Sequence, residues 1–122
     1  MIIGRPHLHY RQVDSTNERA RQVAAGGAPD GTLVTAAEQT AGRGRQGRPW
    51  STPAGSAVAW SVLIRRQVEI PGTLPLQVGT GVCDAVEALG ASGVQMKWPN
   101  DIWIDGRKCA GILVEAGRQD GW

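Results

Sequence analysis

The feature that most constrains the fold is a two-residue turn signal, Asp105-Gly106, near the end of the sequence. It stands between the apolar residues 102–104 and a second segment, 108–115, whose residues 109–114 are apolar or small. An Asp-Gly pair between two apolar runs is typical of a tight β-hairpin, because both turn positions need positive φ. The sequence therefore predicts two adjacent antiparallel strands here, preceded by a short strand at 94–98 that Pro99 ends.

A helix start is predicted near the N-terminus. Ser15 and Glu18 have the spacing of a capping box, in which the serine side chain bonds a backbone N–H group of the first turn. A thin apolar stripe follows, and Gly26-Gly27 is typical of a helix end. Ser15-Thr16-Asn17 is explained by capping alone, but the N–H groups and hydroxyls of a helix start also suit a polar ligand.

Further strands and a second helix are indicated by periodicity. Residues 56–65 alternate strictly in hydrophobicity, which favours a central or near-central strand. The segment 71–75 reads as a connection, and the helix after it is expected to end near residue 89. Gly79 and Gly81 weaken that helix and are expected to allow close packing on a sheet. The remaining strands are predicted at 7–13 and 32–38.

These elements do not follow a strict strand–helix–strand alternation, so the predicted class is α+β, a mixed β-sheet with helices packed on one face. The 122 residues suit one domain, and 41% hydrophobic with 20% charged residues is an ordinary globular composition. A net charge of +2 is too small for a general nucleic-acid binder. We expect no membrane partner and a cytoplasmic location, because the sequence has neither a transmembrane run nor a signal segment.

Residues 39–50 form the most distinctive loop. The stretch Gly42 to Arg48 holds three arginines and three glycines in seven residues, and Trp50 follows. Guanidinium groups bind carboxylates and phosphates, and glycine allows close backbone approach and positive φ. The loop is therefore predicted to bind an anion. A solvated basic turn or a nucleic-acid contact remains an alternative, and the stretch is no P-loop because a Lys-Ser/Thr ending is missing.

Two further polar positions stand out beside the predicted hairpin. Asp101 lies at its mouth, and Lys108 opens a strand whose remaining residues are predicted to be buried. A lysine that enters a buried strand is costly unless it is paired, so Lys108 is a functional candidate. The cysteines, Cys83 and Cys109, are predicted to be small buried hydrophobes. No ligand set for a resident metal is apparent, since His7 and His9 alternate without a third ligand.

Four blocks in this order resemble one family. Residues 42–50, 97–102 and 107–113 resemble the biotin-binding loop, the adenylate-binding motif and the catalytic-lysine strand of biotin protein ligases. Residues 14–17 resemble the helix start that holds the biotin ring. The resemblance covers most of the chain. It implies that residues 1–122 are the N-terminal part of a ligase catalytic domain, without a DNA-binding domain, the remaining strands or the small C-terminal barrel.

The resemblance also implies roles for individual residues. The ureido head of biotin would contact the helix start and Gln39, and its carboxylate would meet the arginine loop and Lys108. Lys108, Arg45 and Asp101 would be catalytic, while Asn100 and Asp101 would contact the nucleotide or its magnesium. The implied biotin-binding set is Ser15, Thr16, Asn17, Gln39, Gly42, Arg43, Gly44, Arg45, Lys108 and Gly111. The implied ATP-binding set is Arg45, Arg48, Trp50, Lys97, Asn100, Asp101 and Lys108.

The activity implied is ATP-dependent attachment of biotin to a lysine of a biotin carboxyl carrier protein through biotinyl-5'-AMP. ATP, Mg²⁺ and biotin are the implied small molecules, DNA is not an implied partner, and a homodimer is left open. Three alternatives stay open: a lipoate or octanoate ligase or transferase, a non-catalytic fragment that binds biotin or nucleotide, and a DNA-binding biotin sensor. Core packing also remains an alternative role for Trp50 and Trp98.

Overall fold

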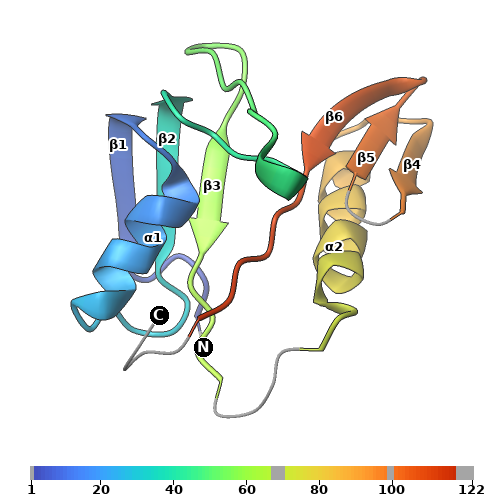
Figure 1. Cartoon of the computed structure of the whole chain (residues 1–122). Helices are drawn as coiled ribbons and strands as arrows, with labels where there is room; N and C mark the ends of the chain where they lie inside the picture. Colours follow the sequence, from blue (N-terminus) through green and yellow to red (C-terminus); the bar gives the residue numbers. More distant parts are fainter. Residues whose placement is uncertain (1, 67–70, 99–100, 118–122) are drawn as a thin grey trace. The chain divides into compact units, whose positions relative to one another are not determined.

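The computed structural model describes residues 2–66, 71–98 and 101–117 (Figure 1). The chain divides into two compact units. The first comprises Met1–Val68 with Glu115–Trp122, and the second comprises Glu69–Val114. None of the helices in the described ranges has the length and apolarity needed to cross a bilayer. The elements are β1 (His7–Val13), α1 (Thr16–Ala25), β2 (Leu33–Gln39), the 3₁₀ helix η1 (Arg45–Gly47), β3 (Ala59–Val62), α2 (Leu74–Ala88), β4 (Val94–Lys97), β5 (Asp101–Ile104) and β6 (Arg107–Gly111).

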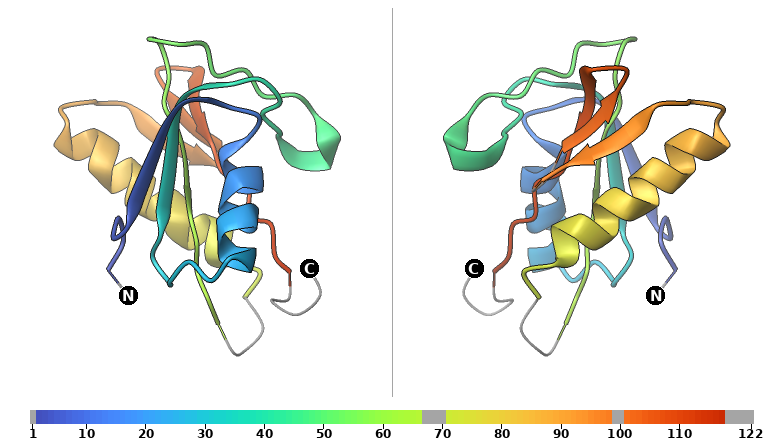
Figure 2. Two further views of the ribbon diagram at one scale, coloured as in Figure 1. Left: turned by 90° about the vertical axis from the view of Figure 1, so that its left-hand side faces the viewer. Right: turned by 90° about the vertical axis from the view of Figure 1, so that its right-hand side faces the viewer.

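The first unit is a three-stranded mixed sheet with one helix against it. β2 lies in the centre, with β1 parallel to it on one side and β3 antiparallel to it on the other. α1 packs against β2 and β3 and lies on one side of the strands (Figure 2). The core between them is made of small residues, among which Val34 and Ala36 of β2 and Ala24 of α1 are fully buried. Small side chains allow the helix to approach the sheet closely.

The predicted helix start is confirmed, with one difference in its capping. Ser15 is the N-cap, and its Oγ accepts a hydrogen bond from the backbone N–H of Glu18 at 3.3 Å. In a capping box the Glu18 carboxylate would accept from the Ser15 N–H. Here Asp14 Oδ1 accepts that bond at 2.7 Å. The side chain of Glu18 is therefore available for another partner. The helix ends at Ala25, with Gly26 as its C-cap.

The strand predicted at 56–65 is shorter than expected and lies at an edge. Only Ala59–Val62 is a strand, and among the described residues it pairs with β2 alone. Ser56 lies in a turn in which its N–H bonds the Pro53 carbonyl at 3.3 Å, so the ladder starts after it. The predicted alternation does hold, since Ala59, Ser61 and Leu63 are buried while Trp60 is exposed.

The second unit is an antiparallel sheet of order β4-β5-β6, and α2 packs against β4 and β5. The right-hand view of Figure 2 shows α2 along one side of these strands. The predicted hairpin is confirmed, because Asp105 and Gly106 join β5 to β6 with φ of 49° and 77°. Both turn residues thus have the positive φ that a type I′ turn needs.

The two glycines of α2 differ in their surroundings. A Cβ on Gly79 would lie 2.4 Å from Met96 Sδ of β4, so the predicted close packing is confirmed there. A Cβ on Gly81 would meet no atom of another described element within 4 Å, so the prediction is wrong for this residue. The helix also begins earlier than expected: Thr73 is its N-cap, and Pro75 lies in the first turn, where proline is tolerated.

The predicted α+β class is confirmed, with mixed sheet pairing in the first unit. The described strands form two three-stranded sheets, each with one helix, where the sequence suggested one sheet. The sequence could not indicate this, because periodicity identifies strands but not the strand each one pairs with.

Candidate active site

The start of α1 carries a connected group of polar side chains from four segments. We name Ser15, Thr16, Asn17, Gln39, Thr52 and Ser61 the helix-start cluster. Gln39, the last residue of β2, accepts hydrogen bonds from the Thr16 N–H at 2.7 Å and from the Thr16 hydroxyl at 3.2 Å. Its Nε2 donates to Thr52 Oγ1 at 3.2 Å. Gln39 therefore satisfies an N–H group of the first helical turn that has no partner within the helix.

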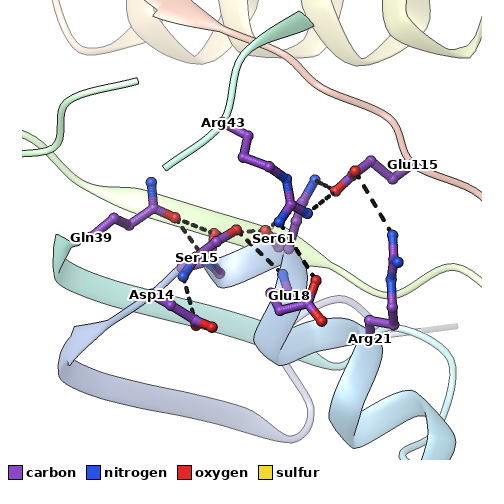
Figure 3. A network of polar contacts seen from close by, with 10 residues as sticks. Asp14, Ser15, Glu18, Arg21, Gln39, Arg43, Ser61 and Glu115 are labelled. Atoms are coloured by element: carbon purple, nitrogen blue, oxygen red, sulfur yellow. Dashed lines mark hydrogen bonds and ion pairs between the residues drawn. The ribbon is translucent and has the colours of Figure 1, made fainter. Parts of the chain in front are cut away.

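Ser61 of β3 completes this cluster from the facing strand. Its Oγ lies 2.7 Å from Thr16 Oγ1 and within hydrogen-bond distance of Asn17 Oδ1. Figure 3 shows Ser61 near Ser15 and Gln39 at the start of the helix. Sequence reasoning missed Ser61 as a site residue. The available signal was its position as a hydroxyl on the otherwise apolar, buried face of its strand, and a buried hydroxyl needs a polar partner.

The arginine loop, residues 42–48, starts beside this cluster. The Ala41 N–H bonds the Asp14 carbonyl at 2.8 Å, which joins the loop to the residue before the helix cap. Trp50 N–H donates to the Gly42 carbonyl at 2.9 Å, and Gly44 N–H donates to the Arg48 carbonyl at 2.7 Å. The loop is therefore a closed, hairpin-like structure, with η1 at its far end (Figure 2).

The loop glycines serve different purposes. Gly47 has φ of 72°, as predicted for a glycine in this loop, and the neighbouring Gln46 also has positive φ, at 59°. Gly42 is needed for close approach, because a Cβ there would lie 2.4 Å from the Trp50 carbonyl oxygen. The atoms that Gly42 approaches belong to Trp50 and Gln39 of the protein itself, where a ligand was expected.

The three loop arginines differ in their contacts. Arg43 Nη2 donates to Glu115 Oε1 at 2.7 Å, and its Nη1 lies 3.5 Å from Glu18 Oε2. Arg45 and Arg48 are exposed, and neither guanidinium has a hydrogen bond or ion pair within the described part of the chain. The two exposed arginines are therefore available to an anion, while Arg43 is held by carboxylates of the protein.

In the second unit, the strand register places several predicted residues on one face of the sheet. Lys97 is paired with Asp101, and Trp103 is paired with Lys108. Cross-strand partners point to the same side, and residues two apart on one strand do so too. These four side chains therefore share one face, and Ile102, which is fully buried, points to the opposite face.

Lys108 forms an ion pair. Its Nζ lies 3.0 Å from Asp101 Oδ1, and the side chains are 35% and 25% exposed. The prediction that the rest of its strand is buried is wrong. Lys108, Cys109 and Gly111 are exposed, because β6 is the edge strand of the described sheet. Burial was also predicted for Cys109 itself, and that too is wrong, whereas Cys83 is partly buried and burial raises the pKa of its thiol.

Lys97 contacts an aromatic residue that sequence reasoning did not select. Its Nζ lies 4.2 Å from the centroid of the Trp103 ring, within the range of a cation–π interaction. Both residues line an open cleft of about 610 Å³, with Gln95, Met96 and Gly106. The cleft includes neither Asp101 nor Lys108. The Trp103 Nε1–H group is buried and has no hydrogen-bond partner among the described residues.

The predicted site residues thus lie in two groups. The first unit brings together the helix start, Gln39 and the arginine loop with Trp50. The second unit brings together Asp101 and Lys108, with Lys97 on the same face and Gly111 at the end of β6. Asn100 lies outside the described residues. No group of three or more His, Cys, Asp or Glu residues suited to a metal ion occurs in the described ranges.

The protein family to which the chain belongs follows from its similarity to known proteins. The sequence profile described as the biotin/lipoate A/B protein ligase family matches residues 8–120. The chain belongs to this family. Among its relatives, the bifunctional ligase/repressor BirA of Bacillus spizizenii is 41% identical over 112 residues, which cover 89% of this chain and 34% of that protein. The biotin–[acetyl-CoA-carboxylase] ligase of Mycobacterium tuberculosis is 42% identical over 115 residues, which cover 88% of this chain and 43% of that protein.

Solved structures of the family agree with the fold. The biotin protein ligase of Aquifex aeolicus, in complex with biotin and ATP, superposes with a TM-score of 0.81 at 33% identity, over 93% of this chain and 47% of that one. The biotin protein ligase of Leishmania major, in complex with biotin, gives 0.74 at 31% identity, over 93% and 52%. The chain spans about a third to a half of the length of these proteins.

Proposed function

We propose that this chain carries the biotin- and ATP-binding part of a biotin–[acetyl-CoA-carboxylase] ligase. The observation that supports the proposal most is the helix-start cluster beside the arginine loop. It offers hydroxyl and amide groups in hydrogen-bond contact with one another, next to two arginines available to an anion. A ureido head with a carboxylate tail needs these two kinds of partner. The Mycobacterium tuberculosis, Aquifex aeolicus and Leishmania major proteins named above are biotin ligases, and the Aquifex aeolicus structure contains biotin and ATP.

The first half-reaction joins two anions. A carboxylate oxygen of biotin attacks the α-phosphorus of ATP, the bond from that phosphorus to the bridging oxygen breaks, and pyrophosphate leaves with the bonding electrons. Fixed positive charge must offset the repulsion and stabilise the charge on the phosphoryl oxygens. We assign this role to Arg45, Arg48 and Lys108. Their guanidinium and ammonium groups donate hydrogen bonds without losing their charge.

The second half-reaction transfers the biotinyl group. A lysine amine of the carrier protein attacks the carbonyl carbon of biotinyl-5'-AMP, AMP leaves with the bonding electrons, and the nitrogen loses a proton to solvent. The acceptor would be a carboxyl-carrier domain of a carboxylase, in keeping with the enzyme names of the relatives. Trp50 and Lys97 are assigned to the nucleotide, together with Asn100, which lies outside the described residues.

Mg²⁺ would be held by Asp101 together with phosphate oxygens of ATP. A carboxylate is the ligand type that Mg²⁺ prefers, and one or two of them suffice when substrate phosphates supply the rest. The ion would neutralise phosphate charge. The Asp101 carboxylate also forms an ion pair with Lys108, whose Nζ lies 3.0 Å from Oδ1. Asp101 therefore also fixes the direction of the Lys108 ammonium.

The test uses the complete gene product that contains this sequence, incubated with biotin, ATP-Mg²⁺ and a purified carboxyl-carrier domain. Mass spectrometry of the carrier should show one added biotinyl group, and pyrophosphate release should depend on biotin. Lys108→Ala should reduce pyrophosphate release by a factor on the order of 10²–10³. Arg107→Ala removes an adjacent exposed cation and is the matched control, which should keep the wild-type rate.

Each remaining alternative has its own outcome in this assay. Transfer from lipoate or octanoate in preference to biotin would indicate the other branch of the family. Biotin or nucleotide binding without pyrophosphate release would indicate a non-catalytic binding protein. A Lys108→Ala variant with the wild-type rate would refute the role assigned to this lysine.

A further inference from the structure

Glu115 lies at the junction of α1 and the arginine loop, although neither its position in the sequence nor any motif marked it. Its Oε1 accepts hydrogen bonds from Arg43 Nη2 at 2.7 Å and from Asn17 Nδ2 at 3.2 Å. Its Oε2 lies 3.8 Å from Arg21 Nη2 (Figure 3). One carboxylate therefore contacts the loop and two positions of the helix.

Arg43 is held from two sides. Besides Glu115, it faces Glu18, whose carboxylate is 3.5 Å away and is not used in helix capping. The hydrogen bond from Arg43 to Glu115 raises the pKa of Arg43, and the ion pairs with both glutamates act in the same direction. The group contains two arginines, Arg21 and Arg43, and two glutamates, Glu18 and Glu115, so its formal charges cancel. An arriving anion would therefore meet little net positive charge at Arg43.

We propose that Glu115 is a positioning residue that fixes the side chains of Arg43 and Asn17, and with them the arginine loop and the start of α1, in one geometry. The proposal rests on the proposed function, because Asn17 and the loop are assigned there to biotin. It changes the role of Arg43, which links the loop to the helix through its ion pairs with Glu115 and Glu18. The anion-binding roles then belong to Arg45 and Arg48.

Such a link has a physical purpose in a loop of this composition. Three glycines within seven residues give the loop many conformations, and each must be abandoned when a ligand orders it. Contacts that order the loop beforehand reduce this entropic cost at binding. Because Glu115 also bonds Asn17, the same carboxylate orders both the predicted head-group end and the loop.

The first measurement follows the loop without any ligand. Trypsin cleaves after Arg45 when the loop opens. Mass spectrometry quantifies this cut separately from the cut after Arg43, because the Glu115 variants remove the partner of Arg43 and so change that cleavage site directly. Glu115→Ala should accelerate cleavage after Arg45 about three- to tenfold, a range reduced for the partial exposure of these side chains. Glu115→Gln should have a smaller effect, since its amide oxygen still accepts a hydrogen bond.

The matched control is Glu38→Ala. Glu38 is a carboxylate of the same unit whose side chain accepts a hydrogen bond from Gln12 of β1 at 3.0 Å. It should leave the cleavage rate unchanged. The double variant Arg43→Ala with Glu115→Ala should cleave no faster than the faster single variant. If the two residues instead acted independently, the double variant would accelerate cleavage by the product of the two single-variant factors.

The second measurement is the biotin dissociation constant by calorimetry, which Glu115→Ala should raise about three- to tenfold. Failure of the wild-type chain to bind biotin would refute the proposed function, while the cleavage experiment would still judge the link between loop and helix. Normal biotin binding with unchanged cleavage in Glu115→Ala would overturn the positioning role and leave the function intact. If Glu115→Ala does not fold, Glu115→Gln and the Arg43→Ala single variant decide the question in the same two assays.

Discussion

A single methyl group at Gly42 should disturb the arginine loop, whereas the same group at Gly44 should be tolerated. At Gly42 the added Cβ would lie 2.4 Å from the Trp50 carbonyl oxygen and 2.7 Å from Gln39 Nε2. At Gly44 it would lie 3.5 Å from the nearest atom, an ordinary contact, and the backbone there is extended. Gly42→Ala and Gly44→Ala are therefore a matched pair, two residues apart in one loop.

The magnitude follows from which atoms must move. The clash at Gly42 involves a backbone carbonyl, which cannot turn away as a flexible side chain can. Relief requires roughly 1 Å of backbone displacement, and overpacking of this kind costs about 1–3 kcal/mol. The movement also strains the 2.9 Å hydrogen bond from the Trp50 N–H to the Gly42 carbonyl, whose net contribution is about 0.5–1.5 kcal/mol.

The free energy of opening the loop sets an upper limit on this cost. The loop can release the strain by breaking the backbone hydrogen bonds that close it, those from Trp50 to Gly42 and from Gly44 to Arg48. We expect Gly42→Ala to lower the free energy of unfolding by about 1–3 kcal/mol. Gly44→Ala should raise it by up to about 0.5–1 kcal/mol, because alanine reduces the conformational freedom of the unfolded chain.

Urea unfolding monitored by circular dichroism gives the free energies, and amide hydrogen exchange measured by NMR gives the local effect. The Trp50 amide should lose protection in Gly42→Ala and keep it in Gly44→Ala. Equal stabilities for the two variants, together with an equally protected Trp50 amide, would refute the close approach of the backbone at Gly42.

Three further outcomes are expected. Ser61→Ala should lower the free energy of unfolding by about 1–3 kcal/mol, because buried polar groups of the helix-start cluster lose a partner; Ser56→Ala, in an exposed turn, should change it by less than about 0.5 kcal/mol in the same urea experiment. Gly106→Ala should destabilise the hairpin by about 1 kcal/mol, measured by the same method, since φ of 77° disfavours a side chain. Burial raises the pKa of Glu115, but its hydrogen bonds with Arg43 and Asn17 outweigh burial and leave the pKa below 4.5. The stability that Glu115 contributes is therefore complete at pH values above 4.5, and it is lost as the pH falls through the lowered pKa. An NMR titration of the carboxyl carbon should show this lowered value, and Arg43→Ala should raise it.

The parts of the fold that sequence predicted well are those decided by nearby residues. The cap at Ser15, the glycine that ends α1 and the Asp105-Gly106 turn each depend on φ preferences or on hydrogen bonds within a few residues. The capping box failed only in its return bond. Asp14 is adjacent to Ser15 and took that bond, a competition between neighbours that the spacing alone does not decide.

Burial was predicted less well, because it depends on what covers a strand. The apolar run after Lys108 reads the same whether a strand is central or at an edge, and β6 is at an edge of the described sheet. Sequence reasoning missed two site residues, Ser61 and Glu115, for a related reason: their partners lie far away in the sequence. Ser61 meets Thr16 across 45 positions, and Glu115 meets Asn17 across 98, distances at which no local pattern operates.

The loop arginines illustrate how structure divides residues that sequence treats as equals. All three have the same guanidinium group, so charge and spacing assign them one common role. Their surroundings separate them: Arg43 lies between Glu18 and Glu115, whereas Arg45 and Arg48 extend from the far end of a loop that is closed by its own backbone bonds. An anion gains most from cations that carry no internal partner, because no existing pair must be broken first. Arg43 therefore supports the geometry in which the other two meet the ligand, and removing it should affect loop order and ligand affinity together.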